Sequence, residues 1–152
     1  MLKIYLDNCC YNRPFDDLRD MQVRAEADSK RFTQSLMSYG VVQLVYSFIS
    51  LYEIRNIRLE DVDKKESILA FIDSVPRKIY VSGANKRRIE EISREIMATG
   101  VKYADATHTA CAIVANCDYL LTTDKRLLKY QTDRIKLISP INFEHIWRRE
   151  NA

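Results

Sequence analysis

The chain has 152 residues and a mass of 17.8 kDa, which suits one compact domain over residues 1–152. With 47% hydrophobic and 30% charged residues, its composition excludes a disordered chain, and a formal net charge of +3 does not by itself establish a nucleic-acid partner. The most apolar stretch, Val41–Tyr52, is too short to span a bilayer and the first residues lack a secretion signal, so we expect a cytoplasmic protein with no membrane partner.

Five short apolar runs predict the strands of a sheet. In chain order they are Lys3–Asp7, Gln43–Ser47, Lys78–Val81, Tyr119–Thr122 and Lys136–Ser139. The interval after the first strand predicts a long helix, because apolar residues recur there at helical spacing. The residues expected to form its buried face are Leu18, Met21, Ala25, Phe32, Leu36 and Tyr39.

Helical spacing returns in the later intervals. The second strand is followed by a helix with Glu53 in its second turn, and the fourth strand by a short helix after Asp124. Three more helices are expected. The first is marked by Ile68–Ile72 and ends before Pro76, and the second is marked by Ile89, Ile92 and Ile96, with Gly100 as the expected C-cap. The third is marked by Ala106, Ala110, Ile113 and Val114.

Strands that alternate with helices, without two-residue hairpin turns, indicate an α/β fold with a parallel sheet covered on both faces. We therefore expect a three-layer α/β/α sandwich with a central, mainly parallel sheet of four or five strands. In such sheets, functional residues gather at the carboxyl ends of the strands, near a topological switch point. The residues that follow the strands are thus the first candidates for a site.

Four carboxylates lie at or near these positions. Asp7 ends the first strand, and Glu53 lies on the helix after the second strand. Asp124 follows the fourth strand, and Asp105 lies in the first turn of the preceding helix, where the helix N-terminus favours the ionised form. Four carboxylates in one cleft repel one another unless a divalent cation binds between them. Oxygen ligands of this kind select Mg²⁺ or Mn²⁺.

Each acid also has a simpler explanation when it is considered alone. Asp105 and Asp124 both stand where a carboxylate caps a helix. Glu53 could be an exposed residue beside Arg55. The four acids together are a more specific pattern than any one of them.

Three segments of the chain together resemble the PIN-domain family. They are IYLDNCCYNRPFDD near the start, SFISLYEI in the middle and YADATHTACAIVANCDYLLTTDKRLL near the end. The resemblance covers essentially the whole chain in the family's order, and the opening segment resembles a bacterial subgroup that begins in this way. The long helical region after RPFDD departs from the family pattern.

The resemblance implies a Mg²⁺- or Mn²⁺-dependent ribonuclease, often the VapC-like toxin of a toxin–antitoxin pair. The positions that match the family's four acids, the last being the most variable, are Asp7, Glu53, Asp105 and Asp124. Ser47 and Thr122 match supporting hydroxyls. On this hypothesis a metal-activated water attacks the phosphorus while basic residues position the RNA. An RNA substrate, an antitoxin partner and a homodimer are further expectations from the resemblance.

The loop after the first strand holds three more candidates. Arg13 is expected to hold a phosphate or to pair with a carboxylate. Asp16 and Asp17 are expected to cap the next helix, with support of the metal site as the alternative. Basic clusters elsewhere are expected to be solvated helix faces, and these are residues 86–88, 125–126 and 148–149.

The cysteines and one histidine have structural roles in this interpretation. Cys9 and Cys10 have no histidine at metal-ligand spacing, which disfavours a zinc or thiol site. All four cysteines are therefore expected to be free and to pack in the core, and these are Cys9, Cys10, Cys111 and Cys117. His108 shares a helical side with Asp105 and is expected to be a structural histidine, with a place in the cleft as the alternative.

Two other functions stay open. The first is a PIN-fold module that binds RNA or a protein without cleavage. The second is a phosphatase or phosphoryl-acceptor domain. A haloacid-dehalogenase-type site needs a second Asp at the position of Cys9, and a receiver-like site needs an Asp at the end of the third strand, where Val81 and Ser82 stand. Those positions disfavour the second alternative.

Overall fold

The structure, a computed structural model, describes residues 1–11 and 19–152. Its centre is a sheet of five parallel strands in the order β3-β2-β1-β4-β5. The strands are β1 (Lys3–Leu6), β2 (Gln43–Ser47), β3 (Lys78–Val81), β4 (Tyr119–Leu121) and β5 (Lys136–Ile138). All five predicted strands are thus confirmed, with small differences at their ends.

Seven α-helices are present in the described part of the chain. They are α1 (Met21–Ser38), α2 (Phe48–Arg55), α3 (Val62–Ser74), α4 (Lys86–Met97), α5 (Tyr103–Val114), α6 (Lys125–Leu128) and α7 (Pro140–Glu150). Short 3₁₀ turns form η1 (Asn8–Tyr11), η3 (Leu59–Asp61) and η4 (Gly83–Asn85). Helix α7 was not predicted. None of the described helices combines the length and the apolar character that crossing a membrane requires.

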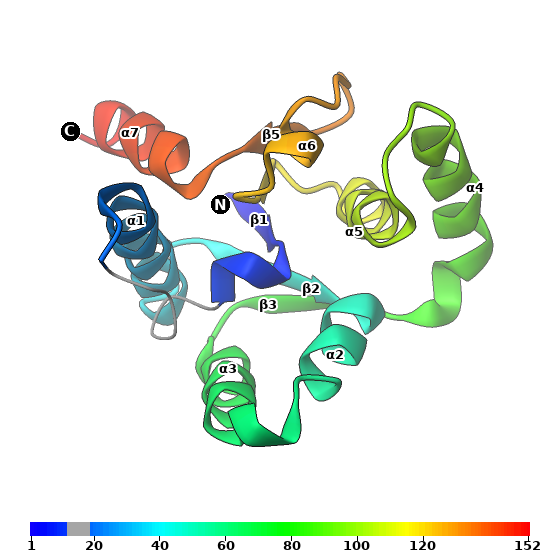
Figure 1. The fold of residues 1–152 in the computed structure, drawn as a ribbon. Coiled ribbons are helices and arrows are strands. Elements are labelled where there is room, and N and C mark those ends of the chain that lie inside the picture. The colour runs from blue at the N-terminus through cyan, green and yellow to red at the C-terminus, as the bar shows by residue number, and fades with distance from the viewer. Residues whose placement is uncertain (12–18) are drawn as a thin grey trace.

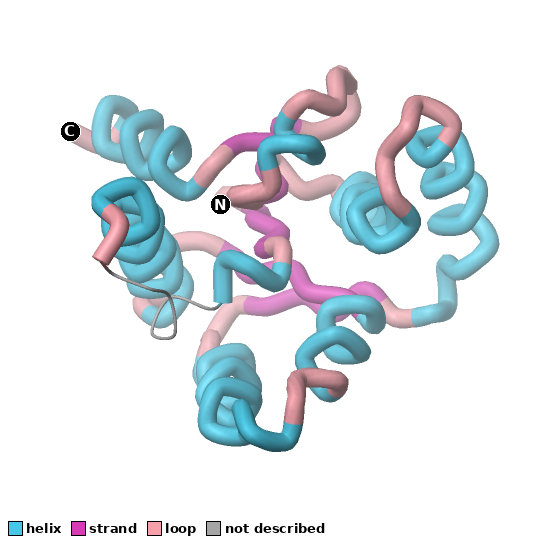
Figure 2. Tube along the Cα trace, in the orientation of Figure 1, coloured by secondary structure: helices cyan, strands magenta, loops and turns pink. Residues whose placement is uncertain are grey.

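The helices cover both faces of the sheet, as Figures 1 and 2 show. Alternate strand residues point to opposite faces. Tyr5 and Leu120 join the core cluster beneath α4 and α5, whereas Ile4 and Leu121 join the cluster beneath α1, α3 and α7. The expected three-layer α/β/α sandwich with a parallel sheet is therefore confirmed.

The strand order places a topological switch point between β1 and β4. The chain leaves β1 for β2 on one side, and after β3 it returns to β4 on the other side of β1. Leu6 is paired with Leu121, and the Asp7 N–H donates to the Leu121 carbonyl at 3.0 Å. The residues that follow β1 and β4 therefore lie side by side at the edge where α/β sheets bind their ligands.

Helix α1 buries a different face from the one predicted. Met21 and Tyr39 are 84% and 83% exposed, so they were wrongly assigned to the core. The residues that the helix buries instead are Ala27, Ser29, Lys30, Thr33, Gln34 and Met37. Polar groups are tolerated there because they are hydrogen-bonded: the Gln34 side chain donates to the Cys10 carbonyl at 2.9 Å.

Gly100 follows α4 but is not its cap residue. The cap is Ala98, and Gly100 lies two residues beyond it with a φ of +102°. The Gly100 N–H donates to the Met97 carbonyl at 2.9 Å. A left-handed conformation of this kind is the reason for glycine at the turn into α5.

Candidate active site

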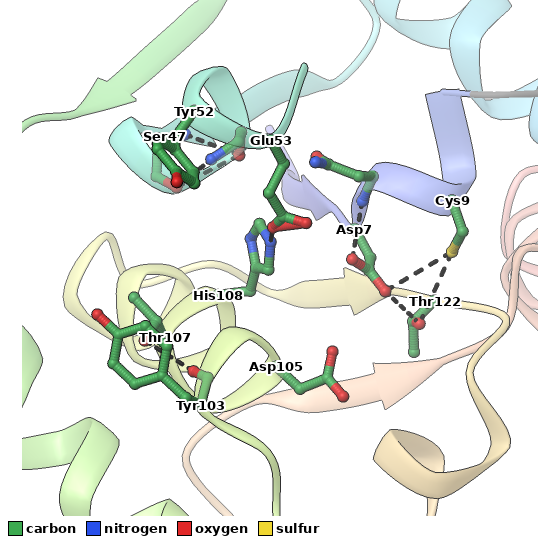
Figure 3. A network of polar contacts seen from close by, with 12 residues as sticks. Asp7, Cys9, Ser47, Tyr52, Glu53, Tyr103, Asp105, Thr107, His108 and Thr122 are labelled. Atoms are coloured by element: carbon green, nitrogen blue, oxygen red, sulfur yellow. Dashed lines mark hydrogen bonds and ion pairs between the residues drawn. The ribbon is translucent and has the colours of Figure 1, made fainter. Parts of the chain in front are cut away.

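Asp7 is a buried carboxylate at the carboxyl end of β1, and both of its oxygens accept hydrogen bonds. Its Oδ1 accepts from the Asn8 N–H at 2.8 Å, and its Oδ2 accepts from the Thr122 hydroxyl at 2.7 Å (Figure 3). The two contacts fix the plane of the carboxylate. The strand pairing of β1 with β4 is what brings Thr122 to this position.

Thr122 also connects Asp7 to Asp124. The Thr122 hydroxyl accepts from the Asp124 N–H at 3.0 Å while it donates to Asp7. The Asp124 side chain is the N-cap of α6, accepting from Arg126 N–H at 2.8 Å and from Leu127 N–H at 3.5 Å through one oxygen. The cap predicted for Asp124 is thus confirmed. Both capping hydrogen bonds use Oδ1, so the other carboxylate oxygen takes no part in the cap.

Glu53 lies in the second turn of α2 and contacts His108 on α5. The His108 Nε2 is hydrogen-bonded to a Glu53 carboxylate oxygen. The His108 side chain is 1% exposed and that of Glu53 is 35% exposed, so Glu53 reaches from a buried partner towards solvent. Figure 3 shows the Glu53 carboxylate turned towards Asp7.

Asp105 lies in the first turn of α5, as predicted, and points into the same space as Asp7 (Figure 3). Burial raises the pKa of Asp105 above its ordinary value, and the neighbouring Asp7 and Asp124 carboxylates raise it further. Glu53 acts in the same direction, while His108 opposes the shift. The four acids therefore share one electrostatic environment, although they are far apart in the sequence.

Cys9 has a place at this site that the sequence did not suggest. Cys10 is buried in the core, as predicted, and Cys9 packs partly against the same cluster. In addition, the Cys9 Sγ lies 3.6 Å from the Asp7 Oδ2 and accepts from the Thr123 N–H at 3.4 Å. The hydrogen bond from the Cys10 thiol lowers the pKa of Cys9, against burial and the Asp7 charge. All four cysteines are free, as expected.

Other predicted residues fall outside the cluster. Ser47 is wholly buried at the N-cap of α2, where its hydroxyl contacts Tyr5 and Ser50 rather than any of the four acids. Arg13, Asp16 and Asp17, together with the helix residue Leu18, lie outside the described residues, and α1 is capped instead by Asp20.

The donor set suits a hard divalent cation. Carboxylate oxygens are hard ligands, and the pKa of Asp105 is raised first by burial and then by the neighbouring carboxylates, whose charge such an ion would offset. Within residues 1–11 and 19–152, however, no three His, Cys, Asp or Glu side chains are grouped closely enough to hold a metal ion. The acids surround a common space without converging on one point, so metal binding would need side-chain adjustment.

A cavity of about 460 Å³ adjoins Asp105. The loop between α4 and α5 and the segment around α6 form its walls. Three of its lining residues are cations, namely Lys102, Arg126 and Lys129, and Tyr130 adds an aromatic ring. The volume lies in the range of small-ligand pockets, and the charge favours an anionic ligand.

The other basic clusters are solvated helix faces, as expected. On α4, the Lys86 and Arg87 side chains approach Glu90 and Glu91 at 3.9 Å and 3.7 Å and are largely exposed. Of the three clusters, the one that contains Arg126 is the one beside the acids.

Comparison with known proteins identifies the fold. No family model matches the chain, and no curated protein matches it either. A chain in the crystal structure of VapBC2 from Rickettsia felis bound to a DNA fragment from their promoter aligns over 90% of this chain and 97% of its own, with 16% identity and a TM-score of 0.56. A chain of DNA-bound VapBC from Salmonella typhimurium aligns over 92% and 99%, with 17% identity and a TM-score of 0.58. The chain thus has the PIN-like fold that its sequence resemblance predicted, and it shares that fold with chains of VapBC complexes.

Proposed function

We propose that the chain is a Mg²⁺- or Mn²⁺-dependent endoribonuclease that hydrolyses RNA phosphodiester bonds. The observation that carries the proposal is the gathering of four carboxylates around one space at the switch point of the sheet. Figure 3 shows Asp7, Glu53 and Asp105, and the Asp124 carboxylate joins Asp7 and Glu53 in raising the pKa of Asp105. A phosphatase with an aspartyl nucleophile is less well supported, because Cys9 occupies the position where its second acid would stand.

In this proposal each side chain has a defined task. Asp7 is oriented by the Thr122 hydroxyl and the Asn8 N–H and would be the first metal ligand. Glu53, Asp105 and Asp124 complete the set of metal ligands. A divalent ion held there would supply positive charge against the phosphodiester and would lower the pKa of a bound water.

The substrate strand would extend from the acids into the cavity beside Asp105. Lys102, Arg126 and Lys129 would hold backbone phosphates there, and Tyr130 could contact a base. Since VapBC chains share the fold, we also propose that the chain is the toxin of a toxin–antitoxin pair, with a protein antitoxin as its partner.

A cleavage assay with labelled single-stranded RNA tests the proposal. The wild type should cleave with Mn²⁺ and not with EDTA, and Asp7→Asn should be inactive. Asp118→Asn is the matched control and should retain activity. Asp118 lies at the opposite end of the sheet, where its carboxylate accepts from the Lys3 N–H at 2.8 Å. Mn²⁺-independent cleavage, or full activity of Asp7→Asn, would overturn the proposed function. RNA binding without any cleavage would favour the non-cleaving alternative.

The cleavage assay, together with a measurement of RNA binding, tests where the RNA strand lies on the protein. Lys102→Gln with Lys129→Gln should raise KM and reduce the salt dependence of RNA binding by about one unit of slope per lost phosphate contact. Arg87→Gln with Arg88→Gln removes the same charge from the solvated face of α4 and should leave KM unchanged.

A further inference from the structure

A chain of buried polar side chains lies behind Glu53. Tyr5 on β1 is wholly buried, and its hydroxyl lies 2.5 Å from His108 Nδ1. The same hydroxyl lies 2.7 Å from the Ser47 Oγ and 3.1 Å from the Ser50 Oγ. His108 Nε2 then contacts Glu53. The set of Ser47, Ser50, Tyr5 and His108 is called the Tyr5–His108 relay below.

With His108 as the neutral imidazole, the contacts of the relay allow one assignment of its protons. An ionised Glu53 only accepts, so His108 Nε2 must carry the proton. In a neutral imidazole Nδ1 then accepts, so the Tyr5 hydroxyl donates to it. The Tyr5 oxygen is left to accept from Ser47 and Ser50. Every hydroxyl and ring nitrogen is satisfied in this arrangement.

The relay begins and ends on the same helix. Ser47 and Ser50 form a capping box at the start of α2, with the Ser47 N–H donating to Ser50 Oγ at 3.1 Å and the Ser50 N–H donating to Ser47 Oγ at 3.4 Å. Glu53 lies one turn later on α2. The hydrogen bonds therefore run from α2 through β1 and α5 and back to α2, which fixes the rotation of α2 against both neighbours.

Core packing alone does not explain these residues. The face of β1 that carries Tyr5 is covered by apolar side chains, among which a Phe would pack without needing a partner. A buried hydroxyl and imidazole destabilise the fold unless both are hydrogen-bonded. The relay avoids that cost only by ending on Glu53, a carboxylate that reaches the shared space of the four acids.

We propose that Tyr5 and His108 are positioning residues that keep the Glu53 carboxylate turned towards the space shared by the four acids, where it would bind a metal ion. The inference rests on the proposed function for what Glu53 binds. His108 acts through Glu53 and need not touch the metal or the substrate. Loss of outer partners of this kind typically weakens metal binding by roughly 10–100-fold.

The proton assignment is tested first in the metal-free wild type. The chain has two histidines, so a ¹H–¹⁵N spectrum of the imidazole nitrogens is readily assigned, with exposed His145 identified by His145→Gln. His108 should show a neutral ring with the proton on Nε2. Tyr5→Phe should shift the His108 Nδ1 resonance. A proton on Nδ1 in the wild type would overturn the relay.

Metal affinity is tested next by calorimetric titration with Mn²⁺. Tyr5→Phe and His108→Leu should each weaken binding by roughly 10-fold or more, and His108→Gln, which keeps a donor near Nε2, should recover part of the loss. Tyr119→Phe is the matched control, because Tyr119 is a buried tyrosine of β4 in the opposite core cluster. Thermal unfolding shows whether each variant is folded. If His108→Leu does not fold, the Mn²⁺ affinity of Tyr5→Phe alone tests the positioning role.

The outcomes separate the relay from the proposed function. If the wild type binds Mn²⁺ and both Tyr5→Phe and His108→Leu bind it equally well, the positioning role is wrong while the metal site stands. If the wild type binds no Mn²⁺, the proposed function and the positioning role both fail, whereas the imidazole spectrum still reports on the hydrogen bonds alone.

Discussion

Asp105 shows the cost of the site at the scale of single residues. Its carboxylate is half-buried near Asp7, Asp124 and Glu53, and its pKa is raised by burial first and by those charges second. A raised pKa in the folded state means that folding favours the protonated form. The contribution of Asp105 to the free energy of unfolding is therefore most favourable below the pKa of the unfolded chain. This contribution is lost as the pH rises through the pKa of the folded state.

Asp105→Asn should consequently stabilise the protein without metal and weaken its response to metal. In EDTA, thermal unfolding should give a higher Tm for the variant at pH 7, and its advantage should shrink as the pH falls towards 4 because the wild-type carboxylate becomes protonated. With Mn²⁺ at 100 times its Kd, the wild type should gain about 2.7 kcal/mol, and the variant much less. A pH-independent difference, or an equal gain with Mn²⁺, would contradict this account of Asp105.

The helices and strands differ in how far the sequence predicted them. The central strands β1, β2 and β4 are mostly apolar and largely buried, so short apolar runs predicted them directly. The buried face of α1 was not readable, because Ser29 and Gln34 face inwards with hydrogen-bond partners supplied by α7 and η1. Such partners come from tertiary packing, which a helical pattern in one segment does not contain.

Helix α6 combines a cap and a proposed metal ligand in one residue, and two substitutions separate these roles. Asp124→Asn keeps a capping oxygen, so it should preserve stability while it weakens Mn²⁺ binding. Asp124→Ala should weaken Mn²⁺ binding similarly and also cost about 0.5–2 kcal/mol through loss of the cap. Chemical denaturation measures the free energy of unfolding, and calorimetry measures the affinity. Unchanged Mn²⁺ binding in both variants would leave Asp124 as a cap alone.

At the scale of the whole molecule, the order of the strands assembles the site. The switch point between β1 and β4 brings Asp7 beside Thr122, and the start of α5 places Asp105 opposite them. The rule that sites lie at strand ends led from the sequence to Asp7, whereas Asp105 was singled out by its place near a helix start and by the family resemblance. It did not find the contacts of Cys9 with Asp7 or of His108 with Glu53, because both join segments that only the three-dimensional packing brings together.

The cavity beside Asp105 places cationic side chains next to the acids. Lys102 comes from the loop before α5, while Arg126 and Lys129 come from the region of α6. The sequence singled out residues 125–126 as one of three similar basic clusters, with nothing to distinguish it. Its position next to the acids is the reason that this cluster, rather than the one on α4, is proposed to contact RNA.

The four acids are proposed to bind a divalent metal ion together, and calorimetric titration of the metal-free protein with Mn²⁺ tests this most directly. The wild type should bind saturably, and Asp118→Asn should match it. The four variants Asp7→Asn, Glu53→Gln, Asp105→Asn and Asp124→Asn should each bind at least 10-fold more weakly, a loss of about 1.4 kcal/mol or more. A wild type that binds no Mn²⁺, or four variants that bind it as the wild type does, would contradict the account.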